Sequence, residues 1–267
     1  MSAGDVRWDP ARRLLDPSAL EGVDAVVTLA GAPVLGSRFA PGHARAVHDS
    51  RLHAARLLVE SFARMDAPPA VLVHGSAIGA YGSRGDEHLD ERSSRGDGFL
   101  AGVIRDAETA ADGASALGTR VVHARTGVVL APGGGAAAPL LLGLRLGAEV
   151  RLGGGRQFWS WITLEDEVRA LEHLLTSELS GPVDLTAPGA ARARELVAAL
   201  GTARGGRVRI PVPIPAWAVR AALGVAAEAV LSSQRVAPRA LLADGFTFVT
   251  PTLDAAAAWV LAPRDDR

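Results

Sequence analysis

The chain has 267 residues, a formal net charge of −1 and no cysteine. This length suits one large domain or a domain with a smaller lobe, and the lack of cysteine excludes disulfides, thiol nucleophiles and cysteine-based zinc sites. A charge near zero without a basic run excludes the electrostatic footprint of a nucleic-acid binder, and no apolar stretch is long enough for a membrane span. We therefore expect a cytoplasmic protein whose partner is a small molecule, with no nucleic-acid or membrane partner.

A strand–helix–strand unit opens the ordered part of the chain. Residues 24–31 are apolar, rich in β-branched side chains and closed by glycine, which is typical of a parallel strand covered on both faces. Apolar residues recur at helical spacing over residues 43–65, and Pro68 and Pro69 end this helix before a second apolar run at residues 71–75. The unit predicts a parallel sheet.

The same pattern then repeats. We expect a helix over residues 98–116, a strand over residues 120–130, and a glycine-rich turn at residues 132–135 that opens a helix rich in alanine and leucine. Successive units of this kind predict a doubly wound α/β fold, which is a Rossmann-like parallel sheet.

The sequence pattern changes beyond residue 180, where frequent prolines predict short secondary-structure elements. A helix is expected over residues 216–230, and an apolar segment follows at residues 246–251. We therefore expect a Rossmann-like domain over residues 1–180 and a smaller α+β lobe over residues 181–267 that completes a cleft on the substrate side.

Three histidines recur every five residues, at His43, His48 and His53. On a helix this spacing turns successive side chains about 140° apart, so they do not share a face. We expect no metal site.

Three loop segments carry a resemblance to a known family. Leu29, Ala30 and Gly31 follow the first predicted strand, residues 76–82 (Ser-Ala-Ile-Gly-Ala-Tyr-Gly) follow the second, and residues 125–130 (Arg-Thr-Gly-Val-Val-Leu) close the third. This ordered set resembles the extended short-chain dehydrogenase/reductase superfamily, which implies a Rossmann-like fold and NADP or NAD as cofactor.

Later segments narrow the resemblance to one branch. Residues 153–166, with the run Gly-Arg-Gln-Phe-Trp-Ser-Trp-Ile, and residues 232–238 and 243–248 are similar to the "epimerase family protein" group. Members of that group carry a C-terminal domain of unknown function, DUF1731. The resemblance covers nearly the whole chain, from Trp8 to Val260.

The chain departs from the superfamily pattern at its start. The resemblance implies a first strand, a GxxGxxG loop and a helix that receive the cofactor pyrophosphate, and no such unit is present. We expect an N-terminally truncated sheet, through a misassigned start, a trimmed chain or an evolved loss. Cofactor binding is then expected to be weak, and the unpaired edge of the strand at residues 24–31 predicts self-association.

A second departure concerns the catalytic pair. Active members place a tyrosine on one helix face with a lysine four residues later, whose cation lowers the tyrosine pKa from about 10. The matching positions here are Phe99 and Val103, and the chain has no lysine at all. Both residues belong to an apolar stripe that helix packing explains.

These observations leave two functional hypotheses. The first is an atypical NAD(P)-dependent oxidoreductase or epimerase-like protein that acts on an unidentified small molecule without the Tyr–Lys pair. The alternative is a non-catalytic nucleotide-responsive or partner-binding protein on the same scaffold.

The resemblance also implies cofactor-binding residues at the ends of the strands. These are Leu29, Ala30, Gly31, Arg51, Ser76, Arg125, Thr126 and Gly127. Arg51 lies at the margin of the apolar stripe of its helix, so its guanidinium either faces the cleft or reaches solvent along its stem.

Ser76 and Tyr81 are the catalytic candidates. Ser76 lies near the catalytic Ser/Thr of the superfamily, although Ala77 is the closer match, and a strand-end hydrogen bond is the alternative role. Tyr81 is the lone tyrosine, and in the superfamily this residue mostly shapes the loop over the substrate. A proton-transfer role would need a nearby cation, such as Arg125 or Arg51.

Tyr81, Gln157, Trp159 and Trp161 are the expected substrate contacts. Trp159 stands where nucleotide-sugar enzymes of the superfamily hold an arginine, which disfavours a sugar nucleotide unless Arg156 substitutes. The two tryptophans suit a flat or apolar ligand, or they pack against the C-terminal lobe. We expect Asp166 to cap the next helix in a structural role.

Overall fold

The computed structural model describes residues 6–35, 42–135, 137–205 and 210–262. Its centre is a parallel sheet in the order β1-β2-β4-β10. The strands are β1 (Ala25–Thr28), β2 (Val71–Ala77), β4 (Arg120–Thr126) and β10 (Gly181–Leu185). Helices cover both faces of this sheet, which confirms the Rossmann-like α/β prediction.

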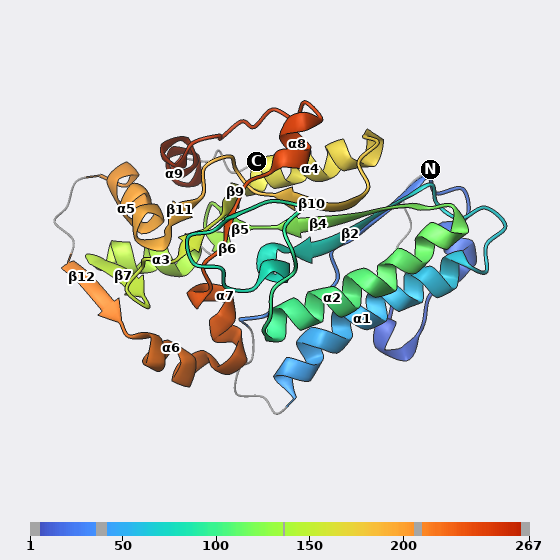
Figure 1. Cartoon of the computed structure of the whole chain (residues 1–267), viewed down its shortest axis with the longest axis horizontal. Helices are drawn as coiled ribbons and strands as arrows, with labels where there is room; N and C mark the ends of the chain where they lie inside the picture. The colour runs from blue at the N-terminus through green and yellow to red at the C-terminus, as the bar shows by residue number, and fades with distance from the viewer. Residues whose placement is uncertain (1–5, 36–41, 136, 206–209, 263–267) are drawn as a thin grey trace.

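Helices α1 (His43–Phe62) and α2 (Phe99–Ala111) lie side by side on one face, and α4 (Leu164–Thr176) covers the other (Figure 1). Side chains of a strand alternate between faces. Leu72 of β2 therefore packs towards α1 and α2, while Val73 packs in the cluster beneath α4. The same alternation decides which polar side chains of β2 and β4 face which helix.

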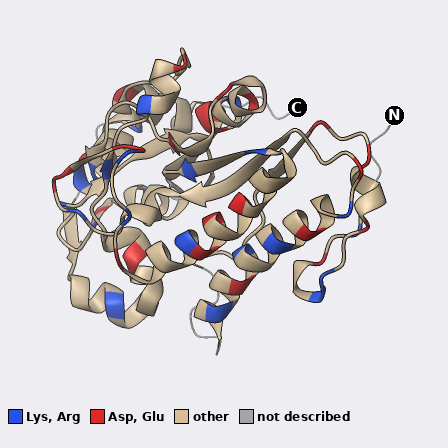
Figure 2. Ribbon diagram, turned by 45° about the vertical axis from the view of Figure 1, so that its right-hand side comes forward, with Lys and Arg blue, Asp and Glu red and all other residues tan. Residues whose placement is uncertain are grey.

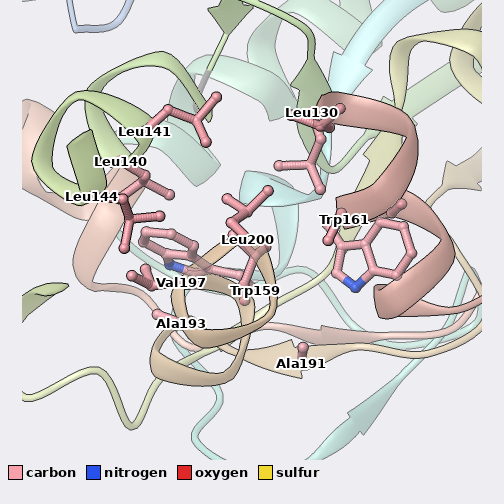
Figure 3. Close-up of a cluster of buried hydrophobic side chains, with 14 of the residues drawn as sticks. Leu130, Leu140, Leu141, Leu144, Trp159, Trp161, Ala191, Ala193, Val197 and Leu200 are labelled. Atoms are coloured by element: carbon pink, nitrogen blue, oxygen red, sulfur yellow. The ribbon is translucent and has the colours of Figure 1, made fainter. Parts of the chain in front are cut away.

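After β4, much of the chain forms short strands and helices outside the main sheet. One sheet joins β6 (Gly134–Gly135), β5 (Val128–Ala131) and β9 (Trp161–Thr163), and a second pairs β7 (Ala148–Leu152) with β12 (Ile210–Ile214). Helices α3 (Ala137–Arg145), α5 (Ala193–Ala203) and α9 (Leu253–Leu261) enclose the apolar cluster of Figure 3.

The remaining elements are short. They are η1 (Pro10–Arg12), η2 (Pro17–Leu20), η3 (Ile78–Tyr81), β3 (His88–Leu89), η4 (Asp112–Leu117), β8 (Phe158–Trp159), β11 (Ala191–Arg192), α6 (Ala216–Leu223), η5 (Gly224–Ala227), α7 (Glu228–Leu231), β13 (Arg235–Val236) and α8 (Arg239–Ala243). The pairing of β13 with β3 and of β11 with β8 ties late segments of the chain to early ones.

Two predicted elements are divided in the structure. The strand expected over residues 120–130 breaks into β4 and β5 at Gly127, where a Cβ would lie 2.5 Å from the carbonyl oxygen of Ser160. The helix expected over residues 216–230 breaks at Gly224, whose φ of 55° is left-handed. Both breaks depend on glycine.

The domain division expected after residue 180 stays a prediction. Strand β10 begins at Gly181 and pairs with β4, so the main sheet continues just past that point. Within the described part of the chain, no helix has the length and apolarity that a membrane crossing requires. Figure 2 shows basic and acidic residues interspersed along the helices.

Candidate functional site

A cavity of about 310 Å³ lies at the carboxyl ends of β1, β2 and β4. In doubly wound folds ligands bind at this edge of the sheet, and the volume is at the lower end of ordinary ligand sites. Its lining comes from three sources: strand ends (Leu29, Ala30, Gly75, Ser76, Ala77, Thr126, Gly127, Val128), the helices α1 and α2 (Val47, Arg51, Leu100, Val103, Ile104, Ala107), and the C-terminal segment (Glu228, Ala229, Ser232, Gln234). The structure thus brings together six of the predicted cofactor residues.

Arg51 supplies the cationic part of the cavity wall. Its Nη1 donates to the carbonyl oxygens of Ala32 and Val47, both at 3.0 Å, and no carboxylate pairs with it among the described residues. The guanidinium lies against Gly31, where a Cβ would be 2.9 Å from its Cζ. Of the two predicted orientations the structure shows the one facing the cleft, and partial burial lowers the pKa of Arg51.

Ser76 belongs to a buried charge network that the sequence did not reveal. Its Oγ donates to Oε1 of Glu108 at 2.6 Å, and Arg125 holds the same carboxylate through two hydrogen bonds of 2.9 Å. Arg95 donates to Oε2 from the other side. Burial alone would raise the pKa of Glu108, but the hydrogen bonds and charge of Arg125 outweigh it and bring the pKa to about 2.

The consequence for Ser76 is a fixed hydrogen-bond direction. Because Glu108 stays ionised, the hydroxyl proton of Ser76 is engaged with its carboxylate, and the Oγ lone pairs remain for the cavity. Ser76 can accept a hydrogen bond from a ligand there. Arg125 does not line the cavity and supports it through Glu108. The sequence feature that could have identified Glu108 is the presence of an acidic residue within the apolar stripe of α2.

Tyr81 lies beneath the cavity rather than in its wall. The side chain has no exposed surface, and its hydroxyl donates to Asp184 at 2.9 and 2.8 Å. Arg125 lies over the ring, with its Cζ 5.1 Å from the centroid. Burial, reinforced by the charge of Asp184, raises the pKa of Tyr81, so the nearby cation does not activate the phenol.

Thr126 joins the cavity to a second buried carboxyl group. Its Oγ1 donates to Oε1 of Glu167 on α4 at 2.7 Å, and Oε2 of Glu167 is buried without a hydrogen-bond partner in the described structure. Burial raises the pKa of Glu167 to about 7, against a smaller lowering by Thr126. Sequence analysis did not single out Glu167, because three acidic residues follow one another in the first turn of α4 and the sequence does not distinguish between them.

His74 contributes a neutral imidazole to the cavity. Burial, and then the neighbouring His123, lower its pKa to about 4, and its Nδ1 is buried without a hydrogen-bond partner among the described residues. His123 contacts Asp112 through Nε2 at 2.8 Å and stacks edge-on against His74. Nowhere in the described ranges do three potential metal ligands cluster.

The face of α2 that lines the cavity is apolar. Val103, Ile104 and Ala107 of α2 line the cavity, and Phe99 begins the helix. None of these side chains can exchange a proton. Any acid–base group must reach the cavity from another element.

The C-terminal segment closes the cavity and holds the start of α2. Glu228 accepts the backbone N–H groups of Phe99 and Leu100 at 3.1 and 3.0 Å, which satisfies two donors at a helix terminus. Gln234 donates to the carbonyl oxygen of Ile78 at 3.1 Å. Segments more than a hundred residues apart in the chain therefore form one wall.

The remaining predicted substrate contacts are not brought to the cavity. Trp159 and Trp161 are 7% and 0% exposed and lie in an apolar cluster (Figure 3) with Leu144 and Leu200. Gln157 donates to backbone carbonyl oxygens of residues 152 and 230. The structure favours the packing alternative for the tryptophans.

Asp166 has a structural role, as expected, but it binds a distant backbone segment and does not cap α4. Thr163 caps α4, and the buried Asp166 carboxylate instead accepts the backbone N–H groups of Val249 and Thr250 at 2.7 and 2.9 Å. It thereby fixes the segment of residues 246–251, which has no regular secondary structure.

Comparisons with known proteins agree with this architecture. The family model "Domain of unknown function (DUF1731)" matches residues 214–260. Epimerase family protein Mb2239 of Mycobacterium bovis is 44% identical over 248 residues, covering 91% of this chain and 80% of the relative. Human epimerase family protein SDR39U1 is 34% identical over 266 residues, covering 97% and 88%.

A solved structure shows the same similarity in three dimensions. The crystal structure of human epimerase family protein SDR39U1 (isoform 2) with NADPH superposes with a TM-score of 0.81 at 32% identity, covering 91% of this chain and 85% of that one. The fold, the position of the cavity and the sequence identity all indicate the same family. The chain belongs to the epimerase family proteins that carry a C-terminal DUF1731 domain, as its motifs indicated.

Proposed function

We propose that this protein binds NADP or NAD at the carboxyl edge of its sheet and uses it to oxidise, reduce or epimerise a small molecule without a Tyr–Lys pair. The observation that carries the proposal is the cavity itself, which joins the ends of three parallel strands to Arg51, a cation without a carboxylate partner among the described residues. The similar human protein was crystallised with NADPH.

The residues that line the cavity fit parts of a dinucleotide, namely a phosphate and a flat ring. Arg51, which has no carboxylate partner among the described residues, suits a phosphate, and the lack of a side chain at Gly31 leaves room for its guanidinium. The apolar side chains of Val103 and Ile104 suit the face of a flat ring. When bound, a nicotinamide supplies or accepts a hydride. Leu29, Ala30, Thr126 and Gly127 are positioned to contact the cofactor.

Polar side chains line the half of the cavity that we assign to the substrate. Ser76 offers a fixed acceptor, which suits a hydroxyl or amide of the ligand. Glu228 and Gln234 lie on the substrate side, in the C-terminal segment. We therefore assign residues 181–267 to substrate recognition and residues 1–180 mainly to the cofactor.

Cofactor titration tests the proposal directly. We expect Arg51→Gln to weaken NADPH binding about 10- to 100-fold, because a charge-assisted hydrogen bond to phosphate is lost. The matched control is Arg56→Gln, an exposed arginine on the same helix, which should bind like the wild type. Equal affinities of the two variants, measured by calorimetry, would contradict the assignment of Arg51.

Hydride transfer separates the proposal from its alternative. With a panel of carbonyl compounds, an enzyme should oxidise NADPH at a rate that depends on the compound. A protein that binds NADPH and transfers no hydride would instead be the non-catalytic nucleotide-responsive protein, which the apolar face of α2 favours.

A further inference from the structure

The cavity lacks an obvious proton donor, since Phe99 and Val103 occupy the positions of the Tyr–Lys pair. Glu108 is held as a carboxylate by Arg125 and gives up no proton near neutral pH. His74 is neutral, and Tyr81 is buried against Asp184. Glu228, which also lines the cavity, accepts the backbone N–H groups at the start of α2, so another group has to supply a proton to a substrate oxygen.

Thr126 and Glu167 form such a path. Thr126 is the last residue of β4 and lines the cavity, and its Oγ1 is 2.7 Å from Oε1 of Glu167. Glu167 is 7% exposed and sits behind Thr126 on α4, so the cavity is one hydrogen bond away from a buried carboxyl group. The second oxygen, Oε2, has no hydrogen-bond partner in the described residues. An ionised carboxylate in this place would be poorly stabilised.

We propose that Thr126 and Glu167 form the proton relay of this protein, with Thr126 meeting the substrate oxygen and Glu167 acting through it. The inference rests on the proposed function, because it assigns the acid–base partner of a hydride transfer. It assigns two residues on the opposite side of the sheet from the usual pair.

The surroundings of Glu167 raise its pKa towards neutrality. On the sheet face that α4 covers, the one charged side chain of β2, β4, β5 and β9 is Arg120, which donates to carbonyl oxygens of Leu174, Leu175 and Leu179 at the far end of the helix. His74, His123 and Arg125 lie on the opposite face, with Ser76.

Charged groups on α4 and on the segment above it are engaged elsewhere. Asp166 accepts backbone N–H groups of the segment of residues 246–251, and Arg169 donates to the carbonyl oxygen of Thr247. His173 pairs with Asp244, and Glu165 and Glu172 are exposed. Desolvation therefore dominates, and it holds the pKa of Glu167 at about 7.

The relay balances as follows for reduction of a carbonyl. A bound reduced nicotinamide would supply the hydride for the new C–H bond, and the carbonyl oxygen would take the hydroxyl proton of Thr126. Thr126 Oγ1 takes a proton from Glu167 along their 2.7 Å contact, in which either oxygen can be the donor while the carboxyl group is protonated. The net result is a substrate alcohol and a Glu167 carboxylate, and oxidation reverses each transfer.

Kinetics give the first test, with NADPH and the carbonyl compound that the wild type reduces fastest. We expect Glu167→Gln and Thr126→Val to lower kcat at least about 100-fold, with KM for NADPH nearly unchanged in Glu167→Gln, which keeps the side chain of Thr126. The limb of the kcat–pH profile near pH 7 should vanish in Glu167→Gln. Thr126→Ser keeps the hydroxyl and should keep most of the activity, and the exposed Glu165→Gln serves as control.

Unfolding gives a readout that needs no turnover. The pKa of Glu167 rises from 4.5 to about 7 on folding, so its stabilising contribution is complete below pH 4.5 and is lost as the pH rises to about 7. His74, with a pKa lowered to about 4, acts in the opposite sense over an overlapping range. The difference between wild type and Glu167→Gln removes the His74 contribution. That difference in unfolding free energy should change across pH 4.5 to 7 and be flat for Glu165→Gln.

The outcomes distinguish this inference from the proposed function. Wild-type turnover that survives in Glu167→Gln, with its pH limb intact, would overturn the relay and leave the proposed function standing. A flat unfolding difference would overturn it as well. A wild type that transfers no hydride would contradict the proposed function and the relay together, whereas the predicted losses with normal NADPH affinity would support both.

Discussion

At the scale of single residues, the lone tyrosine has a packing role. Tyr81 is fully buried and donates its hydroxyl to Asp184, whose pKa is itself raised by burial and by the charge of Glu91. The superfamily resemblance offered Tyr81 as a loop-shaping residue and also as a candidate for catalysis and substrate contact, and its burial favours the loop-shaping role. A group in this position cannot exchange a proton with a ligand in the cavity.

The substitution Tyr81→Phe tests this role. It keeps the ring and leaves the Asp184 carboxyl group without its partner, so the free energy of unfolding should fall by about 1–3 kcal/mol. Denaturant unfolding measures the loss, and kcat should change less than threefold. A loss of kcat of a hundredfold in a protein of normal stability would show instead that Tyr81 takes part in catalysis.

At the scale of elements, helix α2 is completed by a distant segment. The helix starts at Phe99 after Gly98, which has no side chain to cap it, and Glu228 of α7 takes over that role. A Cβ at Gly98 would lie 3.1 Å from Oε2 of Glu228. The C-terminal segment therefore stabilises the helix that forms one wall of the cavity.

Replacement of Glu228 by alanine should expose this dependence. Two N–H groups at the helix terminus lose their acceptor, so we expect a loss of about 1–2 kcal/mol in the free energy of unfolding. Because Glu228 also lines the cavity, KM for the substrate should rise. Glu172→Ala, at an exposed position of α4, is the control. Equal stability of the two variants would show that Glu228 contributes no capping.

At the scale of the whole molecule, β1 forms one edge of the main sheet in the described part of the chain. Strand β1 pairs with β2 and with no other strand in the described residues, and Val27 is 40% exposed. An apolar edge strand with unpaired N–H and C=O groups is a template for another chain. We propose that two copies associate through β1.

Sedimentation at increasing protein concentration tests this association. The wild type should show a concentration-dependent shift towards a dimer, and Val27→Lys should shift it back to the monomer, because a charge on an edge strand opposes pairing. Leu242→Lys places the same charge on α8, at a residue that is 47% exposed, and should behave like the wild type. A wild type that stays monomeric throughout would refute the proposal.

The sequence by itself determined the fold class and the place of the site. The β-branched runs ending in glycine, with amphipathic helices between them, specify parallel strands whose carboxyl ends meet at one edge. Leu29, Arg51, Ser76 and Thr126 were assigned to that edge through the family resemblance, and they line the cavity there. Local pattern suffices for the strands and helices, since strand direction and periodicity are local properties.

Only the tertiary structure decided the chemistry of the site. Glu108, Glu167 and Glu228 are ordinary helical acids in the sequence, and burial and partners separate them into a fixed carboxylate, an acid whose pKa is raised to about 7, and a helix cap. Trp159 and Trp161 were equally suited to a ligand or a core, and packing against distant helices placed them in the core. Burial and charge pairing depend on residues far apart in the chain, so the pattern of the chain could locate the site but could not fix the protonation of its groups.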